Sequence, residues 1–302
     1  MVARTGTVTA VYMTFGVVSL ITAYVKFSSS MRKRQRRAVE EMERDETDLV
    51  YLLIYPRWGL APSLSPSCTC VETFLRLARI PYKVHITYNT SASPTGCLPC
   101  IIHKGKHVAE PSAIIRYLIK EFKVEMDASL NKKNRAVGMA LGSMLEHETR
   151  FALYRTFTRD AAHYIIPYAL CAVEASWPFF ASILSRIKAD FFCSSSLVRL
   201  NLTKEQHEEE YLQDLEAIEG VIGGKPFLFG SKPTSYDCAV YAALLPVITL
   251  RESRYISLPF AFAAQNQVLS GYVRRMSFVA FPDLDELLRA EGHTTGSTSR
   301  TC

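Results

Sequence analysis

A run of mostly apolar residues from Thr7 to Phe27 opens the chain, with no charge before Lys26. About 20 residues in a helix are enough to cross the hydrocarbon core of a bilayer. A basic run follows over residues 31–37, and the positive-inside rule keeps such a run on the cytosolic side. With little basic charge before the apolar run and no small-x-small cleavage pattern, an uncleaved anchor is favoured over a cleaved targeting peptide. The pattern predicts one transmembrane helix within residues 1–28 and a body that faces the cytosol.

Between residues 49 and 125 the pattern changes to alternating strands and helices. Leu49–Tyr55 is apolar on both faces, which is typical of a central parallel strand. The periodicity then predicts an amphipathic helix after Cys68, a strand over Tyr82–Tyr88, a hairpin of Cys100–His103 with His107–Ala109, and a helix over Ala113–Lys120. This order resembles a shortened thioredoxin-like unit. A charged stretch over residues 29–48 precedes it, and we interpret that stretch as a solvated juxtamembrane linker.

Helical patterns dominate the second half of the chain, which we assign to a helical domain over residues 126–291. Thr234-Ser-Tyr-Asp237 fits a capping box, in which the Thr234 hydroxyl accepts from the Asp237 N–H and the carboxylate reaches back. An apolar run, Cys238–Leu245, follows and is a candidate for a buried helix. Polar residues make up the tail, 292–302, which we expect to be disordered.

Composition narrows the class of protein. The chain has 302 residues, 48% hydrophobic and 21% charged, enough for about two folded domains. Its formal charge of +6 falls to −1 without the seven basic residues that precede residue 38, so the sequence predicts no nucleic-acid partner. The eight cysteines of a cytosol-facing body are expected to be reduced. By the same topology, the glycosylation sequons at Asn89 and Asn201 are expected to stay unmodified.

Four short motifs carry a family resemblance. They are Pro62-Ser-Leu-Ser-Pro-Ser-Cys68, Glu72-Thr-Phe-Leu-Arg76, Gly224-Lys-Pro-Phe-Leu-Phe-Gly-Ser-Lys-Pro-Thr-Ser-Tyr-Asp237 and Phe281-Pro-Asp-Leu-Asp285. Together they resemble the glutathione S-transferase superfamily, with the nearest likeness to its failed axon connections and metaxin-like branch. The resemblance covers roughly residues 49–288. It implies an α/β thioredoxin-like domain over residues 49–125, joined to the all-α domain.

The resemblance also implies a site for glutathione. Ser65 occupies the position of a catalytic Ser or Cys, where its hydroxyl would donate to the thiol sulfur; as an alternative, it caps the following helix. Cys68, one turn on, is a candidate low-pKa thiol or else a small buried residue. Pro99 matches the superfamily's cis-proline, which presents the backbone of Leu98 to a bound thiol peptide. At the next helix start, Glu110 matches the family's acidic residue.

Pro111 is the departure from the family pattern. The superfamily places a Ser here, whose hydroxyl and backbone N–H hold the γ-glutamyl carboxylate of glutathione. Proline supplies neither group, although Ser112 could substitute through a shift of one residue. Two further hypotheses use the cysteines: a redox pair of Cys97 with Cys100, and a soft-metal site, which the cramped Cys68-x-Cys70 spacing disfavours. We therefore expect no metal.

These observations leave three functions open. The first is a membrane-anchored adaptor or scaffold with weak or absent catalysis, which tolerates Pro111. A second is a glutathione-dependent transferase that acts on apolar electrophiles. The third is a subunit of an outer-membrane import or tethering complex. Partners would be a membrane, other proteins or a second copy in a homodimer. The anchor does not distinguish the mitochondrial outer membrane from the endoplasmic reticulum.

Overall fold

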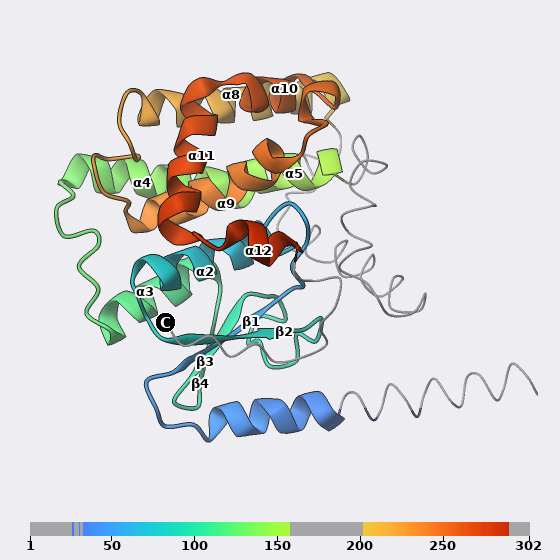
Figure 1. Cartoon of the computed structure of the whole chain (residues 1–302), viewed down its shortest axis with the longest axis vertical. Helices are drawn as coiled ribbons and strands as arrows, with labels where there is room; N and C mark the ends of the chain where they lie inside the picture. Colours follow the sequence, from blue (N-terminus) through green and yellow to red (C-terminus); the bar gives the residue numbers. More distant parts are fainter. Residues whose placement is uncertain (1–25, 27–29, 31–32, 158–201, 290–302) are drawn as a thin grey trace, which may run out of the picture.

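A four-stranded mixed sheet lies in the lower half of the protein, above the N-terminal helix, in the computed structural model, which describes residues 26, 30, 33–157 and 202–289 (Figure 1). The strand order is β2-β1-β3-β4; β1 pairs parallel with β2 and antiparallel with β3, and β3 pairs antiparallel with β4. The strands are β1 Val50–Ile54, β2 Tyr82–Ile86, β3 Cys100–His103 and β4 Lys106–Ala109. The predicted central parallel strand is therefore confirmed as β1, which is buried at every position except the partly exposed Tyr51.

Two helices connect the sheet to the rest of the molecule, and each begins at a proline. They are α2, Pro66–Leu77, and α3, Pro111–Glu121. Proline suits the first turn of a helix because its fixed φ is helical and its missing N–H would be unpaired there in any case. The predicted Ala113–Lys120 helix thus starts two residues early. Ile114 and Leu118 form its buried stripe against the sheet.

Helices alone make up the second domain of the described chain, above α2 and α3 in Figure 1. They are α4 Lys132–Met144, a π-helical turn η1 Leu145–Thr149, α5 Arg150–Arg155, α8 Lys204–Ile222, α9 Ser235–Thr249, the 3₁₀ turn η4 Ser253–Tyr255, α10 Leu258–Gln265, α11 Gln267–Ala280 and α12 Leu284–Arg289. The fold is thus a thioredoxin-like domain followed by an all-helical domain, as the sequence predicts.

Helix α9 lies at the boundary between the two domains and belongs to both cores. Its Cys238 and Ala242 pack with the buried residues of the sheet domain, and its Tyr241 and Leu245 pack in the helical core. The predicted capping box at its start is present. Asp237 is fully buried, yet its carboxylate accepts hydrogen bonds from Thr234 N and Oγ1 at 2.7 Å, and from Leu228 N and Tyr272 Oη at 3.0 Å. The carboxylate therefore fixes the loop before α9 and the neighbouring α11.

A buried carboxylate on α2 organises the loop that precedes this helix. Glu72 is fully buried, and the Arg57 guanidinium donates to both of its oxygens at 2.9 and 3.1 Å. Arg57 also donates to the Pro62 carbonyl oxygen at 3.0 Å, so it ties the loop to the helix. Tyr82 of β2 donates to Glu72 at 3.2 Å and accepts from Arg76 Nε at 2.8 Å. The network thereby joins the loop, α2 and β2.

The network continues into the helical domain through Arg76. Its guanidinium pairs with Asp283 at 2.6 Å and lies 4.4 Å from the centre of the Phe281 ring. Both partners come from the predicted Phe281-Pro-Asp motif, about 200 residues further along the chain. The motif therefore serves as the attachment point of the C-terminal segment on α2.

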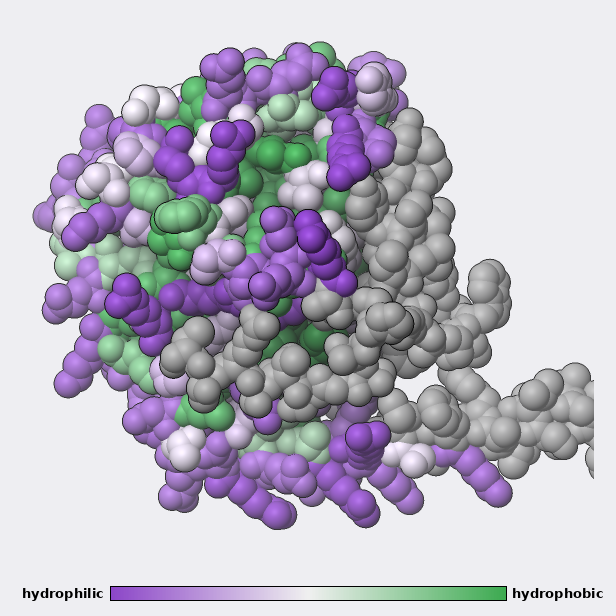
Figure 2. Space-filling model, in the orientation of Figure 1, coloured by the Kyte–Doolittle hydropathy of each residue, from purple (hydrophilic) through white to green (hydrophobic). Residues whose placement is uncertain are grey.

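The charged stretch before β1 contacts the sheet rather than extending into solvent alone. Residues 33–43 are helical, and Met42 is buried against the sheet core. Glu43 pairs with His107 of β4 at 2.9 Å, and Asp48 pairs with Lys104 at 2.6 Å. Figure 2 shows the lower edge of the molecule, where this helix lies, as predominantly hydrophilic. Part of the predicted linker is thus fixed to the body.

No helix among the described residues is long and apolar enough to cross a membrane. The predicted anchor, residues 1–28, lies almost wholly outside the described part of the chain, as does the predicted tail, 292–302.

We expect Arg57→Met to lower the free energy of unfolding by about 3 kcal/mol, because it leaves the buried Glu72 carboxylate without its main counter-charge. Chemical denaturation of the full chain measures this value. The matched control is Arg36→Met, which removes an exposed pair with Glu40 and should cost less than about 1 kcal/mol. Equal effects of the two changes would contradict the structural role given to Glu72.

Acid should destabilise the sheet domain through two histidines. Burial, aided by Lys83 and Lys104 respectively, lowers the pKa of His85 and of His103. A lowered folded pKa means that the unfolded chain binds the proton more tightly, so the free energy of unfolding should fall as pH drops below about 6.5. Denaturation at several pH values measures the slope, and His85→Gln should reduce it. An unchanged slope in that variant would contradict the assignment.

Candidate functional site

A cleft of about 280 Å³ lies between the two domains, at the starts of α2 and α3. The sheet domain supplies one wall, and η1 with α5 supplies the other. The lining residues are Ser65, Ser67, Cys97, Leu98, Pro99, Glu110, Pro111, Glu146, His147, Arg150 and Tyr154. The cleft therefore brings together four of the six predicted site residues: Ser65, Leu98, Pro99 and Glu110.

Ser65 is the N-cap residue of α2 by position, but its side chain makes no capping hydrogen bond. The loop before it is fixed by Arg57, by a bond from Ser63 Oγ to the Tyr55 carbonyl at 2.9 Å, and by one from Leu64 N to the Pro56 carbonyl at 2.8 Å. The Ser65 residue is 5% exposed and borders the cleft. Since the hydroxyl is not used for capping, it remains a candidate donor to a bound ligand.

The Leu98–Pro99 peptide bond is cis, as the family resemblance implies. Both residues are buried at the cleft floor, at the entry to β3. Cys97, which precedes them, is partly exposed and also borders the cleft. The cis bond and Cys97 therefore lie next to each other at the edge of the cleft.

At the start of α3 the cleft is bordered by Glu110 and Pro111, and not by Ser112. The backbone of Glu110 adopts φ +71°, a conformation that residues other than glycine rarely take. The proline that follows restricts the backbone of Glu110 further. Ser112 is exposed and lies outside the lining. The first turn of α3 therefore offers the cleft neither the hydroxyl of Ser112 nor an N–H at position 111.

The buried cysteines are poor nucleophiles. Cys68 is fully buried and lies outside the lining of the cleft. Burial raises the pKa of the Cys70 thiol to about 12 and does the same for Cys100. Since the thiolate is the reactive form, a redox pair of Cys97 with Cys100 would contain one thiol that stays protonated. Within the described residues, no group of three His, Cys, Asp or Glu side chains could hold a metal ion.

The helical wall of the cleft was not among the predicted site residues. Glu146, Arg150 and Tyr154 are spaced four residues apart and so share one helix face. The recurrence of polar residues every four positions was the signal in the sequence that could have identified this wall of the cleft. Arg150 Nη1 donates to Ser67 Oγ at 3.3 Å, across the cleft to α2. The π-helical turn η1 interrupts the helix at this point, and such turns are frequent at functional sites.

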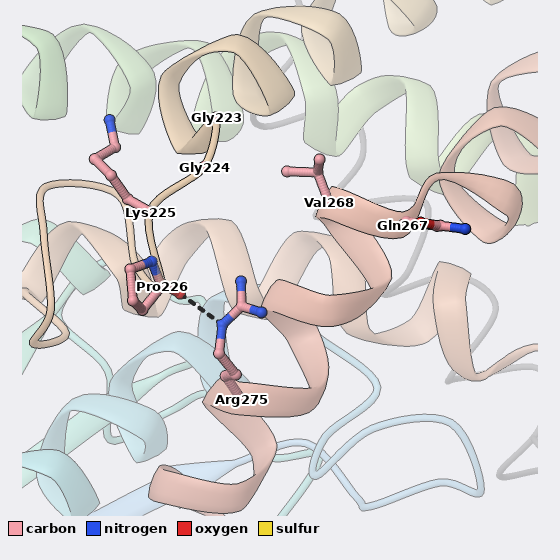
Figure 3. Close-up of a pocket in the computed structure, with 7 residues that line it drawn as sticks. All are labelled: Gly223, Gly224, Lys225, Pro226, Gln267, Val268 and Arg275. Carbon is pink, nitrogen blue, oxygen red and sulfur yellow. Dashed lines mark hydrogen bonds between the residues drawn. The ribbon is translucent and has the colours of Figure 1, made fainter.

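A second hollow, of about 300 Å³, lies between the loop after α8 and α11 (Figure 3). The two basic side chains that line this hollow bind to nearby backbone carbonyls. Arg275 Nε donates to the Pro226 carbonyl at 2.9 Å, and Lys225 donates to the Val221 carbonyl. The hollow has no contact with the predicted site residues. We therefore assign it a structural role in fixing the Gly-Gly-Lys-Pro loop on α11.

Comparison with known families agrees with this geometry. The family described as "Glutathione S-transferase N-terminal domain" matches residues 66–162, and the one described as "Glutathione S-transferase, C-terminal domain" matches residues 211–276. The chain belongs to the glutathione S-transferase superfamily. A mutant of human glutathione-S-transferase T1-1 in its apo form has the same fold, with a TM-score of 0.52 and 16% identity over 82% of this chain and 93% of that one.

Within the superfamily, the chain is similar to failed axon connections and metaxin proteins. Failed axon connections of Drosophila melanogaster is 28% identical over 80% of this chain and 60% of its own length. Metaxin-1 of Mus musculus is 30% identical over 62% and 61% respectively. A Rhodococcus protein, isoprene-epoxide–glutathione S-transferase, is 27% identical over 63% and 82%. The chain thus spans about 60% of the length of the first two relatives.

Thiol labelling tests the description of the cleft. In the native transferase-like body, Cys97 should react with a maleimide well before Cys70 and Cys100, because it alone of these three borders solvent and the other two have raised pKa values. Peptide mapping by mass spectrometry gives the order of labelling, and denatured protein is the control in which all three react. Early labelling of Cys70 would contradict the burial described.

Proposed function

We propose that this chain is a membrane-anchored adaptor of the failed axon connections and metaxin-like type, with weak or absent glutathione-transfer activity. Its anchor is the apolar run Thr7–Phe27, and its body faces the cytosol from the mitochondrial outer membrane or the endoplasmic reticulum. Its partners are other proteins, which the helix fixed beneath the sheet and the exposed body would meet at the membrane surface. Homodimer formation is compatible with this role.

The observation that carries the proposal is the start of α3. Proline at position 111 removes the N–H and the hydroxyl that the family uses for the γ-glutamyl carboxylate, and Ser112 faces solvent outside the cleft. A hydrogen bond to a charged group contributes about 1.5–3 kcal/mol. Its loss weakens glutathione binding by about 10- to 100-fold. The fold is unaffected, because proline favours a helix start.

A second candidate function is glutathione transfer to an apolar electrophile, as the name of the Rhodococcus relative describes for that protein. The specific observation in its favour is the Ser65 hydroxyl, which borders the cleft without a capping bond. A hydroxyl donor there would stabilise a bound thiolate, with help from the dipole of α2.

Turnover separates the two functions. We expect the full chain in detergent micelles to leave the rate between glutathione and an apolar epoxide at its uncatalysed value, and Ser65→Ala to change nothing. Catalysis that Ser65→Ala abolishes would overturn the adaptor proposal in favour of the enzyme.

Pro111→Ser should restore part of the lost site, since it returns both an N–H and a hydroxyl to the first turn of α3. We expect about a tenfold gain in glutathione affinity by calorimetry. Pro259→Ser is the matched control, because Pro259 occupies the first turn of α10 outside the cleft. An equal response of both variants would contradict the role given to Pro111.

A further inference from the structure

We infer that the outward side of the N-terminal helix binds the anionic headgroups of a phospholipid bilayer and holds the body of the protein against the membrane. The helix covers residues 33–43. Its basic face, as we call it, consists of Lys33, Arg37 and Arg44, the last of which directly follows the helix. This contact rests on the proposed function of a membrane-anchored adaptor, to which it adds a second attachment and a class of lipid.

The N-terminal helix has two sides of opposite character. The residues that pack against the core of the sheet domain are Ala38, Val39 and Met42. Lys33, Arg37 and Arg44 follow one another at intervals of four and seven residues, which places them on the side opposite this apolar stripe. All three are exposed, and hydrophilic side chains project along this edge of the molecule in Figure 2. The packing therefore turns the basic face away from the body.

Specific contacts fix the helix in this orientation. Glu43 at its end pairs with His107 of β4 at 2.9 Å, and Tyr51 of β1 donates to Asp45 at 2.6 Å. The turn between β3 and β4 also approaches closely, because a Cβ at Gly105 would lie 3.2 Å from the Glu43 carbonyl oxygen. The charge rule that orients a membrane segment acts without folded structure. This attachment to the body thus points to a role of the basic face in the folded protein.

The carboxylates nearby leave the basic face without counter-charges. Glu40 pairs with Arg36 at 3.2 Å, and Glu43 pairs with the sheet. Within the described ranges, no carboxylate forms an ion pair with Lys33, Arg37 or Arg44. Like charges four residues apart, as at Lys33 and Arg37, repel each other on a helix. An anionic surface would relieve this repulsion.

The position of the basic face in the chain favours a bilayer as that surface. The apolar run that we propose as the anchor ends at Phe27, shortly before Lys33. Even fully extended, the intervening chain spans only ~20 Å, so the basic face stays near the headgroups. Cytosolic leaflets carry anionic lipids that attract Lys and Arg side chains next to a membrane segment. A nucleic acid fits less well, because the chain without its first basic residues has a formal charge of only −1.

Lipid contact at this face would set the orientation of the whole body. The sheet domain lies next to the N-terminal helix, and the helical domain lies on the far side of the sheet (Figure 1). With the basic face on the bilayer, the helical domain would point into the cytosol. It would then be the part of the body that protein partners meet first.

Fluorescence quenching on the full chain in lipid nanodiscs tests the inference. The reporter is a genetically encoded fluorescent amino acid in place of the exposed Glu41, and the quencher is a lipid with a nitroxide on its headgroup. We expect more quenching in phosphatidylcholine discs that contain about 30% phosphatidylserine than in phosphatidylcholine alone. Salt at about 0.5 M should remove the difference, because it screens the charges.

Charge variants identify the residues responsible. Arg37→Gln combined with Arg44→Gln should lower the equilibrium constant for lipid contact about 25-fold, or about fivefold for each charge. Lysine at both positions should preserve most of the contact, since the attraction depends on charge. The matched control is Arg251→Gln with Arg274→Gln, which removes two exposed arginines of the helical domain and should change nothing. Thermal unfolding verifies that each variant is folded.

Three results would overturn the inference. They are equal quenching in the two kinds of disc, equal effects of the two double glutamine variants, and binding of a short DNA duplex by the basic face without a response to phosphatidylserine.

The anchor of the proposed function is tested separately, by retention of the full chain in discs of phosphatidylcholine alone. Retention without a response to phosphatidylserine would leave the anchor and remove the lipid contact. If the discs do not retain the chain, the anchor is wrong. The same reporter then measures binding to added vesicles with and without phosphatidylserine, and a response that depends on Arg37 and Arg44 would still support the lipid contact.

Discussion

The buried carboxylate of Glu72 is the constraint on which the arrangement of this protein depends. A carboxylate without water must be neutralised and hydrogen-bonded, and Arg57 meets that need with two hydrogen bonds. To reach Glu72, the Arg57 side chain must point inward from the loop before α2. In that position it also donates a hydrogen bond to the Pro62 carbonyl oxygen of the same loop. The conformation of the loop that carries Ser65 is therefore a consequence of the ionic requirement of one residue on the helix that follows.

The same network sets the relation between the two domains. Arg76, one turn after Glu72, reaches Asp283 and Phe281 of the C-terminal segment, while α2 packs along α9. Because the cleft lies between these domains, its width depends on this attachment. Ser67 on one wall and Arg150 on the other come within hydrogen-bond distance only when the domains are fixed in this way.

The start of α3 shows that a fold can be kept while a group that binds the ligand is lost. A proline is a favourable first residue for a helix and an unfavourable one for an anion that needs an N–H there. The change at position 111 therefore leaves the architecture intact and alters the chemistry of the cleft alone. A superfamily member that works by binding proteins can accept this change. An enzyme that must bind glutathione has to replace the lost contact with another group.

Local signals in the sequence predicted most of the elements. The apolar run of β1, the apolar periodicity of α2 and the capping box at Asp237 act within a few residues, so they can be recognised without knowledge of the fold. Family motifs extended this to the cis bond at Pro99 and to the sheet-domain wall of the cleft. The sequence left open whether Cys68 is buried and whether Ser112 reaches the cleft, because neighbouring chain segments decide the burial and the direction of a side chain.

Only the tertiary structure decided which residues from distant parts of the chain contact each other. Arg150 faces Ser67 from 83 residues away, and Arg76 meets Asp283 from 207 residues away. The charged stretch before β1 packs on the sheet because Met42 and Glu43 find partners on strands that form much later in the chain. Periodicity and capping are properties of adjacent residues, whereas a counter-charge and a cleft wall are properties of chain segments that folding alone brings together.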